Sequence, residues 1–418
     1  MSMSRITLAV VAAPLLLVAS ACGSTETPSD SASSASVKEV VVGSVTDLSG
    51  PASVYGIPEN QGAQLAVEEV NAKGGIKSLG GAKLKLKPYD TQTTPDQGAT
   101  QAQAAVNDGV SAVLGGEVSD TVLAGTNVTH RAGIPWVNTG GAADKINQRG
   151  YNTVFSNVAN TTQAGTGWQE VIGFVSKELG ISNPTVATSN VSNSYGVALF
   201  DAWKKANSSA GYKLLSDVSY QPGTTDFSAV AARMSNSKAD VLMTLGYPGD
   251  SLALTKSFGT QFKPSSKIWL ATGGDSAQIL KQVGGPADGT ITTIGPVAGM
   301  PGLPPLFDSM SAAYQKKFNE VPTRQSFSGY TSMMFIVAAL EKAASAEPAK
   351  IAAALTSVSL TNDNGNVYPS PAELKFTAQG TLENAPVYYA QLQNGKVEVV
   401  YPASVASAKP IAYGGGLK

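Results

Sequence analysis

The sequence predicts an α/β protein with two units, each built around a parallel β-sheet. From Val37 onward, β-branched runs alternate with segments of helical periodicity, a pattern typical of βαβ units. The chain has 418 residues, more than the roughly 100–200 residues of a single domain. A second series of strands and helices follows the first, so we expect two α/β units of similar build.

The first series runs from residue 37 to about residue 141. The run VKEVVVGSVTD predicts a buried strand, and the next segment has apolar residues at helical spacing until Gly74-Gly75 ends the helix. KLKLKPYD alternates strictly, as a half-exposed edge strand does. Thr94-Pro95 predicts an N-cap and first turn for the following helix. VSAVLGGE, a helix over 120–131 and IPWVNTGG continue the alternation.

The second series has the same alternation, and the end of the chain differs from it. We expect helices over 163–180, 195–209, 226–236, 250–258 and up to about 283, and strands over 184–189, 212–220, 239–246, 267–274 and 290–297. After residue 358 the sequence changes to short strands separated by Asn-Gly turns. This predicts a terminal antiparallel hairpin laid on one of the two units.

The N-terminus contains the only cysteine of the chain, Cys22. A basic Arg5, a short apolar run and the small residues before Cys22 describe a secretory signal over residues 1–21. VASAC resembles a bacterial lipoprotein box, so we expect Cys22 to become a lipidated N-terminus that anchors the domain outside the cell membrane. Residues 22–38 are small and polar and are expected to form a tether. The alternative is a plain signal peptide with an incidental cysteine.

The composition disfavours several classes of function. The net charge is −1 and charged residues make up 14% of the chain, so a nucleic-acid surface is not expected. With one histidine, His130, expected to be solvated near a helix end, neither a histidine-ligated metal nor a Ser-His-Asp enzyme is expected. The sequence has no GxSxG turn, Walker loop or GxGxxG after a strand. We therefore expect no metal, no cofactor and no enzymatic activity.

Seven segments at the predicted carboxyl ends of strands or at helix starts are rich in Gly, Ser, Thr or Asn. Ligands bind at such ends in open parallel sheets, and helix starts offer free N–H groups to an anion. Gly140-Gly141 lets the backbone approach a ligand closely. Each loop alone could merely cap a helix, but together they favour a binding cleft. They are TDLSGPASVYG, GGEVSDT, VNTGGAAD, RQSFSGY, SNVSNSYG, LGYPGD and ATGGDS.

The stretch VGSVTDLSGPASVYGIPENQGAQLAVEEVNAKGGI resembles the opening of type I periplasmic solute-binding proteins of the branched-chain amino acid group. The resemblance continues through NDGVSAVLGGEVS, AGIPWVNTGGAAD, NSYG, DFSAVAARM, ADVLMTLGY and SFSGYTSMMF. It implies two Rossmann-like lobes joined by three crossovers, near 155–158, near 291–296 and after 345. The first lobe is then expected over 39–156 and 292–345, and the second over 157–291 and 346–418.

The resemblance also implies roles for residues of the first lobe. Tyr55 matches an aromatic wall, Ser119 a carboxylate-binding serine, and Gly140 a carbonyl that receives the ammonium of the ligand. With Ser119, the N–H groups of Gly141 and Ala142 are expected to hold an acidic head group.

Three aromatic residues complete the expected pocket. Tyr195 and Tyr247 match tyrosines of the second lobe, and Phe327 matches an apolar wall.

Two positions depart from the family pattern. Ala142 replaces a threonine that touches both head groups of an amino acid, and Gly273 replaces the acidic residue that neutralises the ammonium. A buried ammonium without a partner is costly, although Asp275 or Asp120 could compensate from nearby. We therefore expect a small ligand with a carboxylate or amide end and an apolar or aromatic body, with the α-amino group optional.

The resulting functional expectation is a monomeric, lipid-anchored, extracytoplasmic receptor of an ABC importer that delivers a small solute to a membrane permease. One alternative is a sensor whose closed lobes signal to a membrane partner. An exported hydrolase on a similar fold is disfavoured because no nucleophile–base pair is evident.

Overall fold

The computed structural model describes residues 37–272 and 282–414. The predicted signal, Cys22, nearly all of the tether, Gly273 and Asp275 lie outside the described residues. Within these two ranges, no helix is both long enough and apolar enough to cross a membrane.

The first sheet has five parallel strands in the order β2-β1-β3-β4-β5. The predicted edge strand is confirmed, since β2 pairs only with β1 and its side chains alternate in burial at its start. The strands are β1 (Glu39–Thr46), β2 (Lys83–Asp90), β3 (Ala112–Gly115), β4 (Trp136–Asn138) and β5 (Val154–Ser156).

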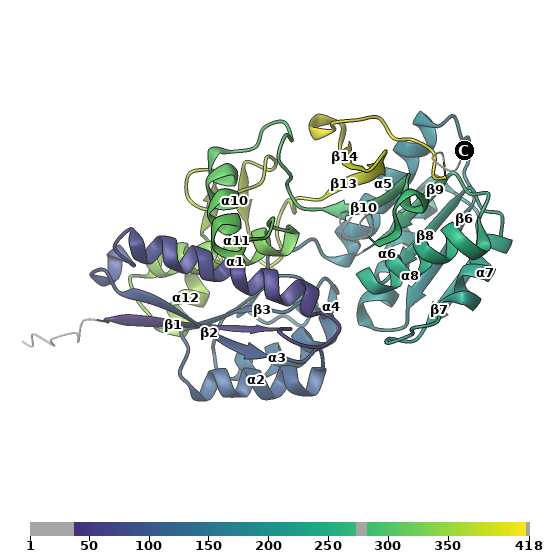
Figure 1. Ribbon diagram of the computed structural model, residues 1–418. Helices are drawn as coiled ribbons and strands as arrows, with labels where there is room; N and C mark the ends of the chain where they lie inside the picture. Colours follow the sequence, from purple (N-terminus) through teal and green to yellow (C-terminus); the bar gives the residue numbers. More distant parts are fainter. Residues whose placement is uncertain (1–36, 273–281, 415–418) are drawn as a thin grey trace, which may run out of the picture. The chain divides into compact units, whose positions relative to one another are not determined.

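Helices cover both faces of the first sheet (Figure 1). Helices α1 (Ser53–Ala72) and α11 (Arg324–Ala343) share a hydrophobic cluster with Val40 and Val42 of β1. Helix α2 (Pro95–Asn107) packs in a different cluster, with Val45 and Val113, and helix α3 (Ser119–Arg131) lies against α2. Even-numbered and odd-numbered valines of β1 thus point to opposite faces of the sheet, because successive side chains of a strand alternate between its two faces.

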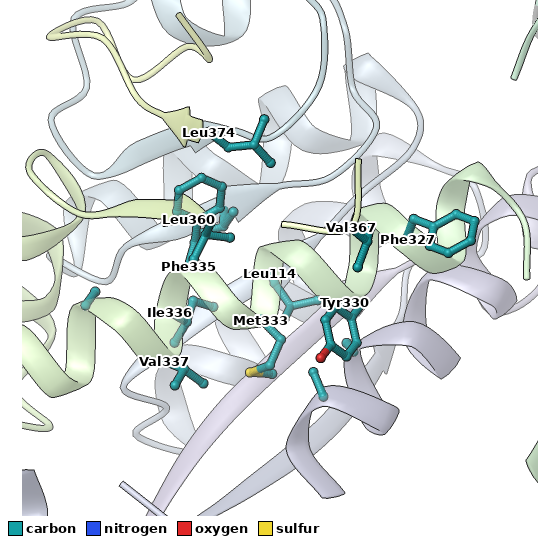
Figure 2. Packing of buried hydrophobic residues seen from close by; sticks show 14 of the residues in the cluster. Leu114, Phe327, Tyr330, Met333, Phe335, Ile336, Val337, Leu360, Val367 and Leu374 are labelled. Carbon is teal, nitrogen blue, oxygen red and sulfur yellow. The ribbon is translucent and has the colours of Figure 1, made fainter. Parts of the chain in front are cut away.

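The cluster around α11 also contains the segments that follow it. Figure 2 shows side chains of α11 packed with Leu114 of β3 and with Leu360, Val367 and Leu374. The sequence expectation placed the last boundary at 345/346; we propose to move it to about residues 383–387, because the segments before it pack in the core of the first sheet, whereas residues 388–391 pair with the strand Thr290–Ile294 of the second sheet. The later segments are α12 (Pro348–Leu355), β11 (Ser359–Thr361) and β12 (Glu373–Lys375), and α10 (Pro305–Phe318), which precedes α11, packs in the same cluster.

The second sheet has seven strands in the order β14-β13-β10-β9-β8-β6-β7. Its parallel part is covered by α5 and α6 on one face and by α7 and α8 on the other, in two separate hydrophobic clusters. The elements are α5 (Thr161–Glu178), β6 (Val186–Val191), α6 (Ser194–Ala210), β7 (Leu214–Tyr220), α7 (Ser228–Asn236), β8 (Val241–Leu245), α8 (Pro248–Ser257), β9 (Ile268–Ala271) and β10 (Thr290–Ile294).

The predicted terminal hairpin is confirmed. Strands β13 (Tyr388–Gln393) and β14 (Lys396–Tyr401) pair antiparallel, and β13 pairs antiparallel with β10. The turn residues Asn394 and Gly395 both have positive φ, 52° and 79°, as a two-residue type I′ turn needs.

The chain passes between the two sheets three times, after β5, after β10 and after β12. This confirms the expected α/β architecture of two parallel sheets with three crossovers. Short helical segments complete the described chain: Lys77–Leu79, α4 (Lys145–Gln148), Phe258–Phe262, Gly285–Ala287 and Ala403–Val405.

Candidate ligand-binding site

One cavity brings together residues from the carboxyl ends of strands in both sheets and from the crossover segments. Its volume is about 130 Å³, which suits a small organic molecule. This is the position where open parallel sheets bind ligands. The lining includes Tyr55, Glu117, Gly140, Ala142, Asn157, Trp168, Tyr195, Gly246, Tyr247, Thr272, Thr293, Arg324, Ser328, Tyr368, Val387 and Tyr389.

Tyr195 and Tyr247 form one aromatic wall, as the sequence led us to expect of residues in the second series. Their ring centroids lie 5.7 Å apart at an interplanar angle of 33°. The amide of Asn193 donates a hydrogen bond of 3.0 Å to the Tyr247 hydroxyl. Burial raises the pKa of both phenols, so they stay neutral and can serve as hydrogen-bond donors or acceptors.

Trp168 and Tyr389 form a second aromatic wall that sequence reasoning missed. Their rings meet edge to face, with centroids 4.8 Å apart and an interplanar angle of 73°. Trp168 lies in α5, where its spacing resembles that of an ordinary core residue, and Tyr389 lies in the terminal hairpin. Nothing local in either sequence indicates a cavity, because only the pairing of β13 with β10 brings Tyr389 beside α5.

Two buried glutamates lie at the first-sheet side of the cavity. Glu117 follows β3 and lines the cavity with 8% of its surface exposed, while Glu59 of α1 is completely buried behind it. Their carboxyl groups are within hydrogen-bonding reach of each other. Burial raises the pKa of both, and the charge of Glu117 raises the pKa of Glu59 further, well above its usual range.

A third carboxylate fixes the loop that carries Glu117. Asp47 is fully buried; its Oδ1 accepts a hydrogen bond of 2.6 Å from the Thr91 hydroxyl, and its Oδ2 accepts one of 3.4 Å from the backbone N–H of Glu117. Burial raises the pKa of Asp47, and these hydrogen bonds oppose the rise. The loop after β3 is therefore anchored by its backbone, which leaves the Glu117 side chain free to face the cavity.

Arg324 supplies a positive charge to the cavity. It is the first residue of α11, after the N-cap Thr323. In residues 37–272 and 282–414, its guanidinium has no ion pair and no hydrogen bond, and it acts on Glu117 only through longer-range attraction. A cation at a helix N-terminus is also opposed by the helix dipole, so this position favours a bound anion.

The glycine pair after β4 has two different roles. A Cβ at Gly140 would lie 2.3 Å from Oε2 of Glu117, so Gly140 makes room for that carboxyl group. Gly141 does not line the cavity; its N–H donates to Oδ1 of Asn138 at 2.9 Å and to the Gly116 carbonyl at 3.0 Å. Ala142, whose N–H was expected to help hold an acidic head group, does line the cavity.

Ser119 and Asp120 lie at the start of α3, outside the set of lining residues. Ser119 is buried, and its hydroxyl oxygen accepts a hydrogen bond of 3.1 Å from the N–H of Ala143. Asp120 is half-buried and lies close enough to Tyr247 for its charge to raise the pKa of that phenol.

Phe327 packs inside the first-lobe core, where 1% of its surface is exposed (Figure 2). Its ring stacks on Phe307, with centroids 5.3 Å apart. Helical periodicity explains this placement: Arg324 and Ser328 are four residues apart and share the face of α11 that lines the cavity. Phe327 lies about 100° around the helix from Ser328 and enters the core instead.

A family model described as "Periplasmic binding protein" matches residues 39–396. The chain belongs to the periplasmic binding protein family. Because the family consists of solute-binding proteins, this periplasmic binding protein is not an enzyme. Among its described residues, no group of three or more His, Cys, Asp or Glu side chains is arranged to hold a metal ion.

A curated relative and two solved structures are similar to this binding protein over most of its length. It is 28% identical over 386 residues to Leu/Ile/Val-binding protein homolog 7 of Brucella melitensis, covering 88% of this chain and 92% of the relative. The leucine binding protein LivK of Thermotoga maritima superposes with a TM-score of 0.75 at 21% identity, over 86% of this chain and 97% of that one.

A second solved structure, a solute binding protein of an ABC transporter from Rhodopseudomonas palustris in complex with 3,4-dihydroxybenzoic acid, also gives a TM-score of 0.75. Its identity to this chain is 18%, over 89% of this chain and 99% of that one. These two likenesses show the fold.

Proposed function

We propose that this protein is the extracytoplasmic solute-binding component of an ABC importer, and that it binds a small ligand carrying a carboxylate and an apolar or aromatic body. The lobes close on the ligand and deliver it, as a monomeric carrier, to a membrane permease.

The observation that carries the proposal is Arg324. A guanidinium that lines a cavity without a carboxylate partner in the described structure is suited to a ligand carboxylate, which it can hold in a bidentate fork. Its charge is further unfavourable at the start of α11 until an anion binds.

The aromatic lining supports the second half of the ligand description. Tyr55, Trp168, Tyr195, Tyr247 and Tyr389 all face the cavity, and small-molecule sites commonly combine such walls with a few polar groups. The relatives fit the same description, since one neighbour binds 3,4-dihydroxybenzoic acid and another is a leucine binding protein.

We also propose that Cys22 is lipidated and holds the domain on the outer face of the cell membrane. The support is the apolar run and small residues before this cysteine and the polar tether after it. A sensor that signals to a membrane partner would use the same cavity, and the genes beside this one would discriminate a permease operon from a signalling operon.

The ligand class is tested by a thermal-shift screen of amino acids, keto acids, aromatic acids, amides and polyols. A ligand at 100 times its Kd stabilises the folded state by about 2.7 kcal/mol, which such a screen detects. Hits are then measured by calorimetry with Arg324→Gln and with Arg233→Gln, an exposed arginine of α7, as the matched control.

We expect carboxylates among the hits, and at least a roughly tenfold loss of affinity, about 1.4 kcal/mol, in Arg324→Gln alone. Hits restricted to polyols, or equal affinity in both variants, would exclude the proposed carboxylate site.

A further inference from the structure

We infer that Glu117 is the binding group for a ligand ammonium, held in place by Glu59 behind it and by the absence of a side chain at Gly140. The inference rests on the proposed function and extends it, because it assigns the second head group of the ligand.

The first argument is the state of the Glu117 carboxyl group. Glu117 lines the cavity, and apart from Glu59 no described residue donates a hydrogen bond to its carboxyl group. A buried acceptor without a partner costs about 1–3 kcal/mol, more when it is charged. A donor that enters the cavity with the ligand removes this cost.

The second argument is how the carboxyl group is kept in position. Gly140 lies directly against it, and any Cβ there would come within 2.3–2.6 Å of its three atoms. From behind, Glu59 is completely buried, and burial raises its pKa more than hydrogen bonding with Thr139 and Thr46 lowers it. Two ionised carboxylates in that setting would repel each other strongly, so one proton is shared between them. With the proton on Glu59, its O–H donates to Glu117, which keeps the negative charge at the cavity wall.

The third argument is the balance of charge in the cavity. Arg324 and an ionised Glu117 together carry no net charge, and their attraction lowers the pKa of Glu117 against the effect of burial. A ligand with only a carboxylate neutralises Arg324 and leaves Glu117 as an unpaired buried anion, which is costly. A ligand with both a carboxylate and an ammonium pairs each of these groups. The geometry therefore selects a zwitterion over a simple organic acid.

The sequence suggested two rival partners, Asp275, which lies outside the described residues, and Asp120. Asp120 is half-buried at the start of α3, does not line the cavity, and is already near the phenol of Tyr247. Asp47 is excluded for a different reason, since its two oxygens accept hydrogen bonds from Thr91 and from the backbone of Glu117.

The test compares amino acids with their deaminated analogues by calorimetry: leucine with 4-methylpentanoate, and phenylalanine with 3-phenylpropanoate. Each pair is measured on the unmodified protein, on Glu117→Gln and on Asp120→Asn. The readout is the ratio of the two Kd values within a pair, because damage to the fold weakens both members alike and leaves that ratio unchanged.

We expect the amino acid of at least one pair to bind tenfold tighter or more on the unmodified protein and on Asp120→Asn. On Glu117→Gln the ratio should fall to about one. Equal affinities on the unmodified protein, or a ratio lost in Asp120→Asn and kept in Glu117→Gln, would overturn the inference while leaving the carboxylate site in place. If neither member of either pair binds, the result contradicts the proposed class of small carboxylate ligands with an apolar body, and it contradicts this inference as well.

Discussion

The carboxyl groups of Glu59 and Glu117 lie within hydrogen-bonding reach of each other, and the folded chain removes both from water. The pair links α1 to the loop after β3, so it belongs to the core and to the cavity wall at once.

The pair makes stability depend on pH. Burial and the charge of Glu117 raise the pKa of Glu59 well above its ordinary value of 4.5. Above pH 4.5 the native state therefore holds a proton that the unfolded state has lost, so the free energy of unfolding falls as pH rises toward the native pKa. Glu59→Gln, which keeps a donor toward Glu117, should remove this loss.

Urea unfolding at a series of pH values from 4.5 upward measures the effect. The stability of Glu59→Gln relative to the unmodified protein should increase with pH, by up to about 1.4 kcal/mol per pH unit for one proton. Parallel pH profiles for the two proteins would show that Glu59 is ionised in the native state.

Gly140→Ala tests the fit around Glu117. The added methyl group would overlap the buried carboxyl group, and overpacking of this kind costs typically about 1–3 kcal/mol. We expect lower stability and weaker ligand binding, both measured by thermal unfolding with and without ligand. Gly249→Ala is the control, since a Cβ at that exposed position of α8 meets nothing within 4 Å. Equal behaviour of the two variants would refute the close fit.

Gly329→Ala should destabilise the first lobe more severely. Gly329 of α11 faces the backbone of Glu59, and a Cβ there would lie 2.0 Å from the Glu59 carbonyl oxygen. Because the obstacle is backbone, the two helices must separate to relieve it. Chemical denaturation should show a clear drop in midpoint relative to Gly249→Ala, and an unchanged midpoint would contradict this account of the α1–α11 contact.

Closure around a ligand is the next expectation. Three crossovers join the two lobes and residues of both line one cavity, so ligand binding should bring the lobes together. Small-angle X-ray scattering with and without a saturating hit from the screen should show a decrease in radius of gyration. A radius that stays constant at saturation argues against closure.

Lipidation at Cys22 predicts a simple change of location. Cys22→Ser should move the protein from the membrane fraction to the soluble fraction while its thermal unfolding and ligand response stay the same. Mass spectrometry of the unmodified protein should find residue 22 at the mature N-terminus with attached acyl chains. A different mature N-terminus, with the variant still on the membrane, would rule out this anchor.

The alternation of strands and helices could be predicted from local sequence because each element carries its own signal. β2 shows alternating burial, Thr94 accepts a hydrogen bond from the N–H of Gln97 as an N-cap, and Asn394-Gly395 forms the hairpin turn. His130 was expected to be solvated, yet its ring stacks on Tyr151 at 3.8 Å. Because His130 and Tyr151 are 21 residues apart in the sequence, no local pattern predicts that their rings stack.

The cavity was only partly predictable for the same reason. Tyr195 lies in the first turn of α6 and Tyr247 is the N-cap of α8, each shortly after a strand, where topology alone brings side chains together. Glu117 and Arg324 belong to the candidate binding segments GGEVSDT and RQSFSGY, but a charged residue in such a segment is usually exposed to solvent. One signal was available: an arginine at the first position of a helix opposes the dipole and calls for an anion. The placement of Glu117 depends on its contact with Gly140. Because the two residues are distant in sequence, no local pattern predicts that contact.

The order of segments along the chain has a consequence for how the protein acquires its structure. The five strands of the first sheet end at residue 156, but their core includes α10, α11 and residues as far along the chain as Val405. The second sheet acquires β13 and β14 only from residues 388–401. Both cores thus stay incomplete until nearly the whole chain has emerged from the ribosome. We expect long-lived exposure of apolar surface in truncated chains, a need for holding chaperones during synthesis, and slow folding dominated by contacts distant in sequence.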